Sequence, residues 1–60
     1  MSLYFTYYEY EVDGSKKGTE SIVSCEGDVT DEEYWEWREK AAIEVGAKHG
    51  TFSVKSFSKL

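Results

Sequence analysis

A run of aromatic and β-branched residues occupies the start of the chain, over residues 3–12 (LYFTYYEYEV). These residue types favour extended structure, and the run contains no helix cap or breaker, so it predicts a long strand. Asp13 and Gly14 then open a turn that Gly18 closes. Residues 19–25 (TESIVSC) predict the returning strand of a hairpin with a five- or six-residue loop.

The clearest local signal is a helix start at residues 30–33 (TDEE). Thr30 suits the N-cap and Glu33 the third helical position of a capping box, and an acidic first turn matches the positive end of the helix dipole. Gly50 follows a basic last turn, so we expect an amphipathic helix over residues 31–49. Its broad predicted core-facing side comprises Tyr34, Trp35, Trp37, Arg38, Ala41, Ala42 and Val45.

Residues 51–57 (TFSVKSF) predict a third strand, whose alternation slips after Val54 and so indicates a β-bulge. A crossover helix returns this strand parallel to the second, which places it beside the first strand in an antiparallel sheet of order 2-1-3. The predicted fold is a two-layer α+β domain of ββαβ type over residues 1–60, with one long helix packed on one face of a three-stranded sheet. Such layouts are common among small bacterial and phage proteins, an analogy that concerns the fold alone.

The first strand divides its side chains between the two faces of the sheet. We expect its uncharged set to meet the helix, because the other set contains Glu9 and Glu11, whose unpaired burial would be costly. In either orientation, one face keeps several large side chains exposed. The uncharged set comprises Tyr4, Thr6, Tyr8, Tyr10 and Val12.

An apolar patch is therefore predicted on the outward face of the sheet. It consists of Leu3, Phe5 and Tyr7 from the first strand, joined by Val23 from the second. Uncovered apolar patches of this kind usually mark interaction surfaces. The two outer strands also have unpaired edges, which invite pairing with another chain.

The short length of the chain makes an interaction through these surfaces more plausible. Sixty residues form one small domain with a marginal core, and such scaffolds usually depend on a disulfide, a metal or a partner. Cys25 is the only cysteine and His49 the only histidine, which leaves no intrachain disulfide and a poor metal site. Aromatic residues make up 17% of the chain. We therefore expect either a core unusually rich in rings or a partner that covers part of them.

Twelve acidic and seven basic residues give a net charge of −5, which repels phosphate and disfavours nucleic acid as a partner. No apolar run approaches the ~18 residues that cross a bilayer, and the first residues lack the features of a signal peptide. A lone thiol is most at home in a reducing compartment. We expect a cytoplasmic protein without a membrane segment.

Candidate chemistry is sparse. Cys25 and His49 are the only possible nucleophile and base, and the predicted layout keeps them apart. No Gly-rich phosphate loop follows a strand, and the acidic residues near the helix start fit no calcium loop. We therefore expect no enzyme activity, no cofactor, no metal and no small-molecule substrate.

Three hypotheses of function follow from these patterns. The first is a non-enzymatic protein that forms a homodimer, or binds a protein partner, through its aromatic sheet face or an edge strand. The second is an acidic inhibitor that mimics nucleic acid and docks on a basic protein surface. The third is a small nucleic-acid-binding or regulatory protein whose aromatic strand stacks bases. The candidate residues of the acidic surface are Asp31, Glu32, Glu33, Glu36 and Glu39.

Overall fold

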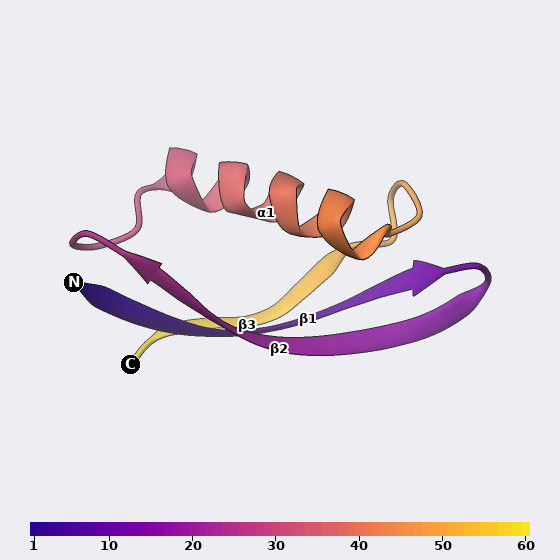
Figure 1. Ribbon diagram of the computed structural model, residues 1–60, viewed down its shortest axis with the longest axis horizontal. Coiled ribbons are helices and arrows are strands. Elements are labelled where there is room, and N and C mark those ends of the chain that lie inside the picture. Colours follow the sequence, from indigo (N-terminus) through magenta and orange to yellow (C-terminus); the bar gives the residue numbers. More distant parts are fainter.

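Three strands and one helix make up the fold, which a computed structural model describes over residues 1–60. They follow in the order β1 (Ser2–Val12), β2 (Ser15–Cys25), α1 (Asp31–Val45) and β3 (Ser53–Lys59). The strands form one antiparallel sheet in the order β2-β1-β3. Figure 1 shows α1 as a second layer along the concave side of the bowed sheet. The predicted α+β fold and strand order are confirmed.

The hairpin turn is tighter than the sequence suggested. Val12 pairs with Ser15, so the turn consists of Asp13 and Gly14 alone, with φ angles of 51° and 77°. Two left-handed residues in a two-residue turn match the twist of the strands, and Asp-Gly is a favoured pair for it. The predicted five- or six-residue loop is wrong, and β2 begins at Ser15 rather than Thr19.

The start of α1 agrees with the sequence. The side chain of Thr30 accepts a hydrogen bond from the Glu33 amide (3.2 Å), and the Glu33 carboxylate accepts one from the Thr30 amide (3.1 Å). This reciprocal pair satisfies two amides that no helical carbonyl can reach. The predicted capping box is confirmed.

The end of α1 lies earlier than expected. Gly46 adopts a left-handed conformation with φ of 71°, and its amide donates to carbonyls of the last turn. The chain then leaves the helix axis, and the amide of Lys48 donates to the carbonyl of Glu11 (2.8 Å). The predicted extension of the helix to His49 is wrong, because the first of two glycines already supplies the left-handed stop.

The core lies between β1 and α1 and is built from rings. Four of the five buried residues are Tyr4, Thr6, Tyr8 and Tyr10 of β1, and the fifth is Ala41 of α1. The uncharged set of β1 therefore faces the helix, as expected. No Leu, Ile or Val is among the buried residues, and the only fully buried side chain is that of Thr6.

A bulge in β3 sets which of its residues face α1. Tyr7 pairs with Ser56 and Tyr8 with Val54, which leaves Lys55 as the extra residue. The bulge expected after Val54 is confirmed. Because the inserted residue shifts the alternation, Val54 and Phe57 share the helix-facing side although their numbers differ in parity.

Candidate protein interface

The sheet face opposite α1 carries the candidate interaction surface. Leu3 of β1 is 44% exposed, and Phe5 and Tyr7 of the same strand are half-buried. Phe5 lies directly opposite Ile22 of β2, and directly opposite residues of an antiparallel pair share one face. Ile22 is 53% exposed and extends this apolar surface across two strands.

Val23 does not lie on this surface, so its predicted place in the patch is wrong. It pairs with Tyr4, which is buried on the helix side, and it lines a hollow together with Trp37. The cause is the number of residues in the turn between β1 and β2. A loop with an odd number of residues would place Val23 on the outward face. The observed two-residue turn shifts the register, so that Val23 lies on the inner face and Ile22 on the outer one.

Both chain ends add to the exposed surface. The amide of Leu60 donates to the carbonyl of Leu3 (2.9 Å), and the Met1 sulfur lies 3.2 Å from the hydroxyl of Ser24. Figure 1 shows the two termini at the same end of the sheet. Four of the six exposed large apolar side chains lie at this end. We call Met1, Leu3, Phe5, Ile22 and Leu60 the outer patch.

Sequence reasoning missed three members of the outer patch, Met1, Ile22 and Leu60. The Asp-Gly pair carried the signal for Ile22, because a two-residue turn fixes the register of the whole hairpin. No comparable signal was available for the two terminal residues. Their positions depend on how far the sheet pairing continues, which tertiary contacts decide.

Tyr7 shares the outer face, but its hydroxyl bonds to a neighbouring residue of the same strand. Its hydroxyl donates to a carboxylate oxygen of Glu9 (3.2 Å), and its ring lies so close to Gly18 that a Cβ there would meet the hydroxyl. The hydrogen bond to Glu9, followed by partial desolvation, raises the pKa of Tyr7. Lys55 also approaches Glu9, at 4.0 Å. Tyr7 therefore forms a polar margin of the outer patch.

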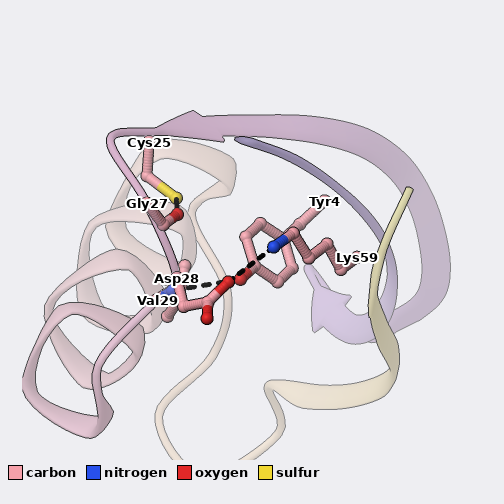
Figure 2. A network of polar contacts seen from close by, with 6 residues as sticks. All are labelled: Tyr4, Cys25, Gly27, Asp28, Val29 and Lys59. Atoms are coloured by element: carbon pink, nitrogen blue, oxygen red, sulfur yellow. Dashed lines mark hydrogen bonds and ion pairs between the residues drawn. The ribbon is translucent and has the colours of Figure 1, made fainter. Parts of the chain in front are cut away.

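A polar network fixes the sheet end next to the outer patch (Figure 2). Lys59 donates to Asp28 (2.6 Å), and the amide of Val29 donates to the hydroxyl of Tyr4 (3.1 Å). The ammonium of Lys59, through this hydrogen bond and its charge, lowers the pKa of Asp28, and the carboxylate in turn raises the pKa of Lys59. The network ties the end of β3 to the loop before α1 and so holds Leu60 beside β1.

The candidate nucleophile and base do not lie together. Cys25 ends β2, and its thiol donates to the carbonyl of Gly27 (3.2 Å). His49 follows the far end of α1, a 15-residue helix that measures about 22 Å at 1.5 Å per residue.

No group of three or more His, Cys, Asp or Glu side chains is arranged to hold a metal ion. The helix is too short and too polar to span a membrane.

The five acidic candidates are all exposed, but they do not share one surface. Glu33 and Glu36 line the hollow between α1 and β2. Glu39 lines a separate hollow near the end of the helix, with Arg38 and Phe52. A single basic surface would therefore not meet them all from one direction.

The chain has no match among protein-family models, curated proteins or solved structures. Its function is therefore inferred from its own geometry.

The molecule measures 37 × 19 × 15 Å, and Figure 1, drawn down the shortest axis, shows the sheet nearly edge-on with α1 stacked above it. The outer sheet face thus spans the longest and the shortest dimensions and is slightly convex.

Proposed function

We propose that this protein is a non-enzymatic interaction module that self-associates as a homodimer through the outer face of its sheet, with the outer patch at the centre of the contact. One observation carries the proposal: the chain buries none of its Leu, Ile or Val residues, while Leu3, Ile22 and Leu60 are exposed at one end of the open face. These three aliphatic side chains thus lie where a second copy could cover them.

Stability favours the same arrangement. A core of five buried residues in sixty is small, and domains of this size usually gain stability from a staple or a partner. Full burial of a Leu, Ile or Phe side chain contributes about 1.5–3 kcal/mol. Covering Leu3, Phe5 and Ile22 in a dimer would therefore add stabilisation that the monomer lacks.

The dimensions of the face predict how tight the association is. With extents of 37 and 15 Å the face is small, and a standard interface buries roughly 800 Å² per partner. The outer patch occupies only one end of this convex face, so the contact covers less than the whole face. We therefore expect a dimer in equilibrium with monomer at micromolar concentrations rather than a permanent assembly.

Two-fold symmetry suits the distribution of residues on this face. The outer patch lies at the end with both termini, whereas Glu9, Glu11 and Lys16 lie toward the hairpin turn. A two-fold contact buries the same patch on both copies. With the axis through the outer patch, the two hairpin ends point away from each other and their charges stay in water.

Light scattering after size-exclusion chromatography tests the proposal, with the mass followed from micromolar to millimolar protein. We expect the wild type to shift from monomer to dimer, and Phe5→Glu to remain monomeric because it places a charge inside the contact. Ile43→Glu is the matched control, because Ile43 is 81% exposed on the helix, and it should behave as the wild type does. A wild type that stays monomeric throughout, or two variants that associate alike, would refute the proposal.

A salt series separates this proposal from binding through charge. An apolar contact persists at high ionic strength, whereas exposed ion pairs are screened. The wild-type dimer should therefore be equally populated, or more so, in high salt. A dimer that dissociates as salt is added would show that charged groups, and not the outer patch, hold it together.

A further inference from the structure

Strand β2 has a free edge along its whole length, because it pairs only with β1. The two-residue turn makes Val12 and Ser15 a hydrogen-bonded pair, and such pairs alternate along an antiparallel ladder. The even-numbered residues of β2 therefore direct their amides and carbonyls away from β1. Glu20, Ile22 and Ser24 are the members of this set in the half of the strand that ends beside α1.

A groove lies beside the last residues of β2 (Val23, Ser24 and Cys25), because α1 leans toward β3. The Trp37 ring lies 5.2 Å from that of Phe57, and Arg38 donates to the carbonyl of Phe52 (2.9 Å). Since β2 contains no aromatic residue, only its smaller side chains, such as Val23 and Cys25, line the opposite side. A hollow of about 250 Å³ remains between α1 and β2, with Val23, Cys25, Val29, Tyr34, Trp37 and Phe57 among its lining residues.

We infer that this groove binds an extended segment of another protein, which pairs with the free edge of β2 as a fourth strand. Alternate side chains of the segment then point into the groove, against Val23 and Trp37, and should be apolar. The side chains between them point to the outer face beside Glu20. This surface borders the outer patch at Ile22, whose backbone it uses, but it consists of the strand edge and the helix side of β2, so it goes beyond the self-association proposed above.

Charge indicates the polar part of the segment. Glu33 and Glu36 of α1 line the groove against a single cation, Lys40, and Glu20 is exposed on β2, the strand that borders the groove. The whole chain carries a charge of −5. A segment that alternates apolar with basic residues therefore fits both the groove and its margin.

A second copy of β2 is a poor occupant of the groove. Pairing two β2 strands antiparallel about Ser21 would present Thr19, Ser21 and Lys17 of one copy on the helix side of the other. These side chains are polar or charged, and none fills a groove lined by Trp37. The lysines of β2 lie at its turn end, where lysine protects an edge, and not beside the groove.

The probe is a short acetylated peptide that alternates lysine with valine, labelled with a dye and titrated by fluorescence anisotropy. Two control peptides replace the valines with serine or the lysines with glutamate. We expect saturable binding of the first peptide and binding at least about tenfold weaker for each control. Equal binding of the serine peptide would reduce the effect to charge alone and overturn the inference, as would no binding of any peptide.

Protein variants test the edge itself. Glu20→Pro removes an edge-facing amide without taking a donor from the β1 ladder, since proline is tolerated on edge strands. Glu20→Ala is its matched control and removes only the charge. The proline variant should bind about tenfold more weakly than the alanine variant, from the lost hydrogen bond and the altered edge. Equal binding by these two variants would contradict strand addition.

A second test does not depend on how well Glu20→Pro folds. N-methylation of the peptide at alternate residues blocks one edge of its backbone at a time. Wild-type protein should lose binding to one methylated series and keep binding to the other, and loss or retention of both would refute edge pairing.

Tryptophan fluorescence tests where the peptide binds. In the Trp35→Phe variant, Trp37 is the sole tryptophan, so its emission should shift as the groove fills. An unchanged emission on saturation would place the peptide elsewhere.

Discussion

Phe5 of β1 lies directly opposite Ile22 of β2 on the sheet face that α1 leaves open. Phe5 is half-buried by its neighbours, and Ile22 is 53% exposed. Cross-strand pairs of an aromatic and a β-branched residue stabilise a sheet. Here the pair also presents the centre of the outer patch to the surroundings, so one contact serves both the hairpin and the proposed dimer.

Replacing Ile22 with Lys should abolish association while leaving the monomer almost as stable as before. The side chain is more than half exposed, so its loss should change the free energy of unfolding by only about 0.5 kcal/mol. Urea denaturation at low protein concentration measures that value, and light scattering measures the mass. A variant that still dimerises would exclude Ile22 from the interface.

Tyr7 and Gly18 should be energetically coupled across the first two strands. A Cβ at Gly18 would displace the Tyr7 ring and break its hydrogen bond to Glu9. Gly18→Ala should therefore cost about 1 kcal/mol in the wild type. In a Tyr7→Ala background it should be neutral or stabilising, because glycine within a strand is itself unfavourable by roughly 0.5–1 kcal/mol. Urea unfolding of the four proteins gives the coupling, and strictly additive effects would contradict the contact.

The two tryptophans of α1 should differ in their contribution to stability. The Trp37 ring lies 5.8 Å from that of Tyr8 and 5.2 Å from that of Phe57. Trp35 is 58% exposed and has the Arg38 guanidinium 5.2 Å from its ring. Trp37→Leu should cost about 2–3 kcal/mol, and Trp35→Leu less than about 1 kcal/mol. Thermal unfolding measures both, and equal losses would show that α1 is rotated from the described orientation.

Acid should weaken the link between Asp28 and Lys59. The pKa of Asp28 is lowered by the hydrogen bond and charge of Lys59, so the folded state binds the proton less tightly than the unfolded state does. This contribution to stability is present above the ordinary aspartate pKa of roughly 3.9, and it is lost as the pH falls through the lowered value. The difference in unfolding free energy between wild type and Asp28→Asn should therefore shrink on acidification.

The alkaline side gives the complementary check on this pair. The pKa of Lys59 is raised by Asp28, so the contribution is present below the ordinary lysine value of roughly 10.4 and disappears as the pH rises through the raised one. Denaturation of wild type and Asp28→Asn across the pH range measures both the loss of stability at acidic pH and the loss at alkaline pH. A constant difference between the two proteins would show that the pair contributes nothing through its charge.

Local rules in the sequence sufficed for much of the fold. The capping box at Thr30, the bulge after Val54 and the helix-facing set of β1 all follow from residue type and periodicity. Each of these features is decided by neighbours in the chain or by one buried face. The strand order followed from connectivity, which leaves few ways to return a strand after a single helix.

The errors arose where two local choices competed. Gly46 and Gly50 could each end the helix, and the contact between Lys48 and Glu11 favours the earlier one. Asp13 and Gly14 could open a long loop or form the whole turn, and this choice moved Val23 to the inner face. Trp35 was placed on the core side because the helical wheel gave a broad apolar face, but it is 58% exposed and so lies at the margin of that face.

Intermolecular contacts between labelled and unlabelled copies test the central claim most directly. In an isotope-filtered nuclear Overhauser experiment on a mixed sample at millimolar concentration, the side chains of Leu3, Phe5 and Ile22 should show contacts with protons of the other copy. Residues on the helix, such as Ile43, should show none. Intermolecular contacts confined to α1 or to the edge of β3, or a complete absence of them, would contradict a dimer formed through the outer face of the sheet.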